Sequence, residues 1–276
     1  MQDHGAPPTR QSAGSTYILG NASPEARARF DALSTLYDRA TIQHLESCGV
    51  GLGWNCLEVG GGGGTIAAWL AERVGADGHV LVTDLDPRFL DCSKLPNLEV
   101  RRHNVVTDPL PEAAFDLIHS RLVLIHLPER QKVLARLMAA LRPGGWLVVE
   151  DFDSGSLPSD PFLNSGEIQL KTQTALYRVV EDAGLERRWG RLLHSHMRAL
   201  GLVDVRAEGR LSMWQGGSPG AALTRANFQQ LQDALIGGGL VTEQEFQRDI
   251  ARLDDPYFTM PSPIMWTAWG RRPTAR

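Results

Sequence analysis

The residues best suited to bind a ligand lie in a glycine-rich stretch near position 60. The segment runs from Glu58 to Thr65 and holds five consecutive glycines that begin at Gly60. Glycine adopts backbone conformations that other residues resist, and it lets a ligand approach the main chain closely. Five glycines in a row would cost much chain entropy as a plain turn, so we interpret the stretch as a ligand-binding loop.

A second signal is the acid that follows the next apolar run, about twenty residues beyond the glycines. Asp84 ends that run, where a carboxylate can accept hydrogen bonds from both hydroxyls of a ribose. Asp86 is close enough to compete, but Asp86 before proline is more typical of a helix cap. The dinucleotide pattern is formally matched by Gly62, Gly64 and Ala67. The spacing alone therefore leaves open both S-adenosylmethionine (SAM) and NAD as the ligand.

Strand and helix patterns alternate around these residues. Apolar runs predict strands at 54–60, 79–86, 98–104, 115–120, 146–153, 202–208 and 263–273. Helical patterns occupy 65–75 and 128–145 between them, and the stretch from 155 to 201 is also helical. Such alternation implies a parallel sheet with both faces covered and right-handed crossovers. We predict an α/β fold with a doubly wound, seven-stranded, mostly parallel Rossmann-like sheet and a helical lid inserted after strand five.

Three motifs together resemble the class I SAM-dependent methyltransferases. They are E-x-G-x-G-x-G from Glu58 to Gly64, the acid Asp84, and Leu-Arg-Pro-Gly-Gly at 141–145. The resemblance covers roughly residues 17–269. It is to the branch that includes ubiquinone- and menaquinone-biosynthesis methyltransferases and many bacterial natural-product enzymes. It implies SAM as the cofactor and S-adenosylhomocysteine (SAH) as the product.

The resemblance also implies roles for single residues around the glycine loop. Glu58, Gly60 and Gly62 would hold the methionine end of SAM, with the backbone near Gly60 meeting its ammonium group. Asp84 would bind the ribose, and Leu85 would pack on the adenine.

Further roles fall on residues that follow later strands. Asn104, with the Val105 backbone, would contact the adenine edge; the family usually has aspartate there, but an amide oxygen can also accept a hydrogen bond. Ser120 and Arg121 would line the methionine pocket, and Tyr17 would close over the cofactor. The implied domain organisation is a loosely ordered tail (1–22), a SAM-binding core (23–153), a helical substrate lid (154–201), and the rest of the core with a helical insertion (202–276).

Catalytic residues are harder to assign, because SAM brings its own leaving group and a base is needed only when the acceptor must lose a proton. His126 is our candidate base, with a histidine hydrogen-bonded to backbone as the equal alternative. Asp151, at the end of strand five, is a candidate for orienting the acceptor. An apolar pocket for a hydrophobic acceptor is predicted from Trp189, Leu192, Met197, Met213, Trp214 and Phe228.

Charge and composition limit the partners. The formal net charge of −4 argues against a surface that neutralises phosphates, so we expect no nucleic acid. There is no apolar run long enough to span a bilayer and no signal peptide, and three cysteines without metal-ligand spacing fit a reducing cytoplasm. His194 and His196 point about 200° apart on a helix, so we expect no metal. The expected partner is a small-molecule acceptor, with a homodimer as one option.

Two other functions fit part of the pattern. One is a regulatory protein that binds SAM without turnover, which an intact glycine loop does not exclude. The other is a nucleotide-dependent oxidoreductase on the same sheet. It would need a nicotinamide pocket and a proton donor such as a Tyr-x-x-x-Lys pair, which the sequence does not contain.

Overall fold

A seven-stranded sheet forms the centre of the computed structural model, which describes residues 18–90, 95–155 and 170–274. The strands are β1 (Asn55–Val59), β2 (His79–Asp84), β3 (Leu98–Arg102), β4 (Phe115–Arg121), β5 (Leu141–Asp153), β6 (Val203–Arg210) and β9 (Ile264–Arg271). Their order is β3-β2-β1-β4-β5-β9-β6, and within this sheet β9 runs in the direction opposite to the other strands. The predicted seven-stranded, mostly parallel, Rossmann-like sheet is confirmed.

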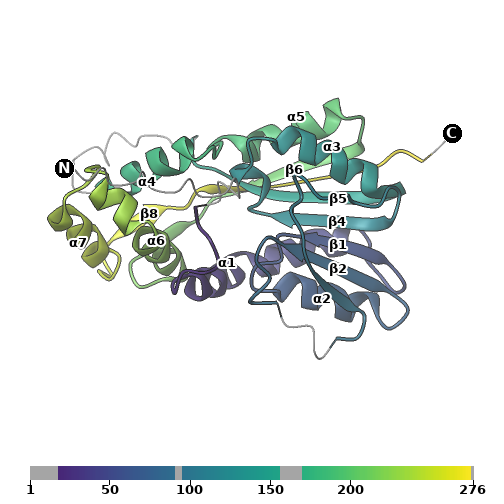
Figure 1. Ribbon diagram of the computed structural model, residues 1–276, viewed down its shortest axis with the longest axis horizontal. Coiled ribbons are helices and arrows are strands. Elements are labelled where there is room, and N and C mark those ends of the chain that lie inside the picture. The colour runs from purple at the N-terminus through teal and green to yellow at the C-terminus, as the bar shows by residue number, and fades with distance from the viewer. Residues whose placement is uncertain (1–17, 91–94, 156–169, 275–276) are drawn as a thin grey trace, which may run out of the picture.

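Helices cover both faces of the sheet (Figure 1). Helices α1 (Ala26–Ser47) and α2 (Thr65–Val74) pack on one face, and α3 (Arg130–Ala140) and α5 (Trp189–Ala199) pack on the other. Parallel strands covered on both sides must be apolar along most of their length, which explains the buried runs of β1 and β2. No helix in the described ranges is long and apolar enough to cross a membrane.

A second group of elements lies beyond the carboxyl ends of the strands, at the left of Figure 1. It consists of α4 (Lys171–Asp182), α6 (Pro219–Gln230), the π-helix η2 (Asp233–Gly237), α7 (Glu243–Arg252) and the strand pair β7 (Met213–Gln215) and β8 (Thr259–Pro261). We call this group the lid. Its own apolar core includes Leu176, Phe228 and Phe246.

The segments that form the lid differ from the expected range of 154–201. Part of it comes from 213–261, within the range 202–276 that is predicted to hold the rest of the core and a helical insertion. Helix α5, expected in the lid, instead buries Trp189, Leu193 and Met197 in the main core beneath the sheet. An amphipathic helix has the same pattern whichever apolar surface it meets, so the pattern did not distinguish the two positions.

Candidate active site

A cavity of about 870 Å³ opens at the carboxyl ends of β1, β2 and β4 and continues beneath the lid. Ligands of open α/β sheets bind at this edge, and the volume lies in the upper part of the range for small-molecule sites. Residues 19–22 also line it, and Asn21 is buried there. These residues of the expected tail therefore form part of the site, whereas Tyr17 lies outside the described residues.

The glycine loop forms one wall of the cavity. Gly60 and Gly62 both line it and both have left-handed backbone conformations, with φ of +73° and +53°. A Cβ atom on Gly60 would lie 2.2 Å from Cγ2 of Val123, so only glycine fits there. The loop is therefore shaped for close approach to the main chain, as the sequence predicts.

The carboxylate of Asp84 is joined directly to this loop. It accepts hydrogen bonds from the backbone N–H of Gly62 at 3.0 Å, the backbone N–H of Asp86 at 2.9 Å and Nδ2 of Asn21 at 3.4 Å. Burial raises the pKa of Asp84, while the two backbone N–H groups act in the opposite direction. Asp86, by contrast, directs its carboxylate to exposed Arg88 at 2.8 Å. Of the two acids, Asp84 is the one fixed against the loop.

Leu85, Asn104 and Val105 line the cavity beyond Asp84. The turn that holds them is fixed by Asn104, whose Oδ1 accepts from the N–H of Val106 at 3.0 Å and whose own N–H donates to Asp108 at 2.9 Å. The amide oxygen of Asn104 keeps a second lone pair for a ligand. These positions suit the adenine end of a nucleoside.

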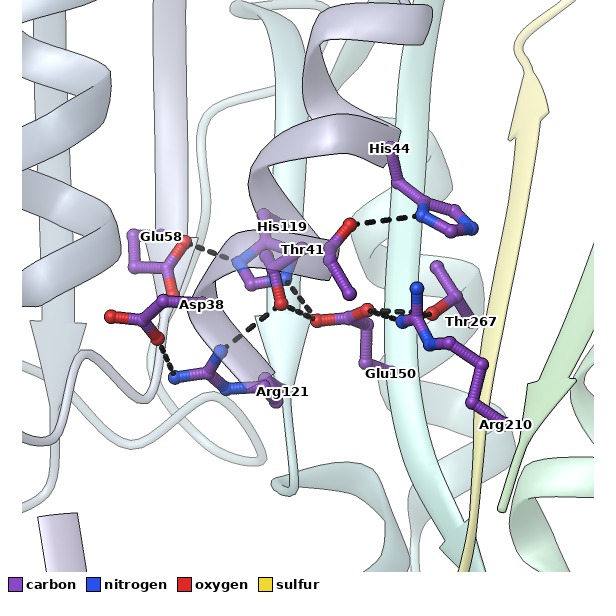
Figure 2. Close-up of polar contacts among 10 residues, drawn as sticks. Asp38, Thr41, His44, Glu58, His119, Arg121, Glu150, Arg210 and Thr267 are labelled. Carbon is purple, nitrogen blue, oxygen red and sulfur yellow. Dashed lines mark hydrogen bonds and ion pairs between the residues drawn. The ribbon is translucent and has the colours of Figure 1, made fainter. Parts of the chain in front are cut away.

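Arg121 also lines the cavity, but Glu58 and Ser120 are buried and do not. Figure 2 shows Glu58 beside His119, whose Nδ1 lies 2.6 Å from Oε2 of Glu58 and whose Nε2 lies 3.4 Å from Oε2 of Glu150. Burial alone would lower the pKa of His119, but the two carboxylates outweigh it and raise the pKa to about 9. The imidazole ring is therefore positively charged at neutral pH.

The same polar network continues through Glu150 into α1 and the far strands. Glu150 accepts hydrogen bonds from Thr267 at 2.6 Å, from Arg210 at 3.4 Å and from the hydroxyl of Thr41. Arg121 in turn donates to Thr41 at 3.0 Å (Figure 2). Burial would raise the pKa of Glu150, but the bond to His119 and the nearby positive charges lower it to about 2.

The two candidate catalytic residues lie in different environments. His126 belongs to the short helix η1 (Leu124–His126) and lines the cavity. Burial and the positive charges of Arg29 and Arg130 lower its pKa to about 3. Asp151 is fully buried, does not line the cavity, and has its pKa raised well above its usual value by burial. It is therefore not placed to touch an acceptor, in contrast to the expectation.

Two cavity residues were missed by the sequence analysis. Arg29 of α1 is only 3% exposed, and its guanidinium donates to Gln230 and to Oδ1 of Asn21 at 3.4 Å. Within the described ranges, no carboxylate lies at ion-pair distance from it. Asn227 of α6 has a buried Oδ1 with no hydrogen-bond partner in the described part of the chain. The sequence did contain a signal for Arg29, because it is a cationic residue on the buried face of α1.

The lid end of the cavity combines apolar side chains with polar ones of α4 such as Gln173, Thr174 and Arg178. Trp214 lines it, as expected, with Leu33, Phe152, Leu176, Leu223 and Met260. The other residues of the predicted acceptor pocket lie elsewhere. Trp189 and Met197 are in the core under the sheet, Phe228 is in the lid core, and Leu192 and Met213 are exposed.

Comparison with known proteins agrees with this geometry. A family model described as a methyltransferase domain matches residues 57–149. Methyltransferase str2 of Strobilurus tenacellus is 33% identical over 198 residues, which are 68% of each chain. The ubiquinone/menaquinone biosynthesis C-methyltransferase UbiE of Francisella tularensis subsp. novicida is 30% identical over 124 residues, 42% of this chain and half of that protein.

Solved structures share the fold at low sequence identity. Phosphoethanolamine N-methyltransferase 2 of Haemonchus contortus, solved with phosphomonomethylethanolamine and SAH, superposes with a TM-score of 0.60 at 13% identity. The superposition covers 96% of this chain and 61% of that one. The YcgJ protein of Bacillus subtilis gives a TM-score of 0.58 at 12% identity, over 87% of this chain and all of that one. With the matched domain, the related sequences and the glycine-loop fold together, the chain belongs to the family of class I SAM-dependent methyltransferases.

Proposed function

We propose that the protein transfers a methyl group from SAM to a hydrophobic small molecule held between the strand tips and the lid. The observation that carries this proposal is one continuous cavity with a polar end at the glycine loop and an apolar end at Trp214 and Leu223. SAM supplies an activated methyl group and its own leaving group. The protein must then align the acceptor and exclude water.

The residues at the polar end fit the parts of SAM in order. Asp84 accepts hydrogen bonds from the ribose, and Leu85 packs on the adenine. Asn104 and Val105 contact the adenine edge. The backbone of Gly60 and Gly62, which both line the cavity, holds the methionine end. Arg121 lines the methionine pocket directly. The pocket is completed from beneath the cavity wall by the buried residues Glu58 and Ser120.

Arg29 is the residue that we assign to the carboxylate of the methionine moiety. A guanidinium buried without an ionised partner is costly, and a ligand carboxylate would supply that partner. Replacing Arg29 by glutamine should weaken SAH binding about 10-fold or more, since a hydrogen bond to a charged group contributes roughly 1.5–3 kcal/mol. Binding is measured by calorimetry. Arg27→Gln, an exposed change on the same helix, is the control and should change affinity less than twofold; an equal effect of both would contradict the assignment.

The apolar end is assigned to the acceptor. Leu33, Trp214 and Leu223 provide apolar surface, and the unpartnered Oδ1 of Asn227 can accept one hydrogen bond from the acceptor. A few polar groups within an apolar wall are the usual way that a small-molecule site fixes orientation, and polar side chains of α4 and α6 such as Gln173 and Thr224 also line this end.

His126 is proposed as the group that accepts a proton from the acceptor or orients it. Because its pKa is lowered to about 3, the ring is neutral throughout the neutral range. His126→Ala should lower single-turnover methyl transfer roughly 100-fold, the scale of general-base catalysis, with SAH affinity kept within twofold. The acceptor is the best substrate from a labelled-methyl screen. The wild-type rate should show no acid limb near pH 6.5; a mutant with normal turnover would leave His126 a structural role only.

A further inference from the structure

His119 is a buried charged residue with no place in the contacts proposed above. It is completely buried in β4, and its two ring nitrogens face two carboxylates, Glu58 at 2.6 Å and Glu150 at 3.4 Å. Glu58 and His119 are direct register partners on neighbouring strands, so the shorter contact is fixed by the sheet itself. Figure 2 shows the three side chains in a row across β1, β4 and β5.

The groups around this row balance its charges. Arg210 reaches Glu150 from β6 at 3.4 Å. Arg121, beside the row, pairs with Asp38 of α1 at 2.8 Å. Glu58 has no such second cation among the ion pairs of the described residues, so His119 is its counter-ion.

We propose that His119 is a positioning residue for the cofactor. Its imidazolium holds Oε2 of Glu58 and fixes that carboxylate beneath the cavity wall, where its negative charge attracts the ammonium group of the methionine moiety. The inference rests on the proposed role of Glu58 at the methionine end. It extends that role to a residue that touches no ligand.

The physical reason is the cost of an unpaired charge in the interior. Without the imidazolium, two buried carboxylates would face each other without their shared cation, and Glu58 would lose the partner that fixes its position. A residue that only supports the sheet would affect every part of the ligand, whereas a residue that acts through Glu58 affects the amino-acid end alone.

The test compares two ligands on two variants. SAH carries the amino-acid group, and 5′-methylthioadenosine carries the same adenosine and thioether without it. His119→Gln removes the cation; the double variant His119→Gln with Glu150→Gln also removes one carboxylate, which restores the charge balance and guards against misfolding. In calorimetry, we expect SAH to bind the double variant at least 10-fold more weakly than wild type, and 5′-methylthioadenosine to change less than twofold.

Two outcomes would overturn the inference: unchanged SAH affinity in the double variant, or an equal loss for both ligands. Glu58→Gln separates this inference from the proposed role of Glu58 on which it rests. If Glu58→Gln weakens SAH binding and the loss of His119 does not, His119 has no positioning role while the role of Glu58 stands. If Glu58→Gln leaves SAH affinity unchanged, the role of Glu58 is wrong, and the role of His119 is overturned with it.

Discussion

Replacement of Asp84 by alanine is expected to weaken the binding of SAM and SAH by roughly 100-fold or more. Two ribose hydrogen bonds to a charged acceptor would be lost, and each contributes about 1.5–3 kcal/mol. The loss should be larger because Asp84 also accepts from the N–H of Gly62 and so anchors the glycine loop. Calorimetric titration with SAH measures the change directly.

Asp86→Ala is the matched control, since it removes a carboxylate two residues away that pairs with exposed Arg88. We expect less than a threefold change in SAH affinity for it. An Asp84→Ala variant that binds SAH as tightly as wild type would show that the ribose lies elsewhere. An Asp86→Ala variant with the larger loss would transfer the ribose contact to Asp86.

Replacement of Glu150 by alanine is expected to lower the free energy of unfolding by about 3–5 kcal/mol, the usual cost of removing one partner from a buried ion pair. The side chain is fully buried and joins His119, Arg210, Thr41 and Thr267. Without it, the imidazolium of His119 keeps only one carboxylate partner. Since domains are stable by about 5–15 kcal/mol, this loss should be plain in urea unfolding.

Glu208→Ala is the control, because Glu208 is an exposed carboxylate on β6, which β9 separates from β5 in the sheet. Its effect should stay below about 0.5 kcal/mol. The contribution of Glu150 should also depend on pH. Its pKa of about 2 in the folded protein lies below the usual 4.5, so the stabilisation is complete above pH 4.5 and is lost as the pH falls toward 2. A Glu150→Ala protein as stable as wild type at pH 7 would contradict this account.

The sheet and the glycine loop could be predicted because their signals are local. Each strand is a short apolar run, and the ends of the loop fall where strand and helix patterns meet. Asp84 was predicted for the same reason, since it directly follows a buried strand. The arrangement of α5 and the lid helices could not be predicted in this way, because it depends on which apolar surfaces meet across long sequence separations.

The charged row beneath the loop also escaped the sequence analysis, although a signal for it was present. Glu58, His119 and Glu150 each lie next to apolar residues in the buried part of a strand. Buried ionisable groups need partners, so three of them in neighbouring strands predict mutual pairing. Which one meets which depends on strand order and register, and the sequence does not state these.

The central claim is that the cavity holds SAM through the glycine loop and Asp84. The most direct measurement is calorimetric titration of the purified protein with SAH and, separately, with NAD. The account predicts one SAH site per chain with micromolar or tighter affinity, and no heat of binding with NAD. Binding of NAD alone, or no binding of SAH, would mean that the loop holds a different ligand, and the residue assignments at the polar end of the cavity would be wrong.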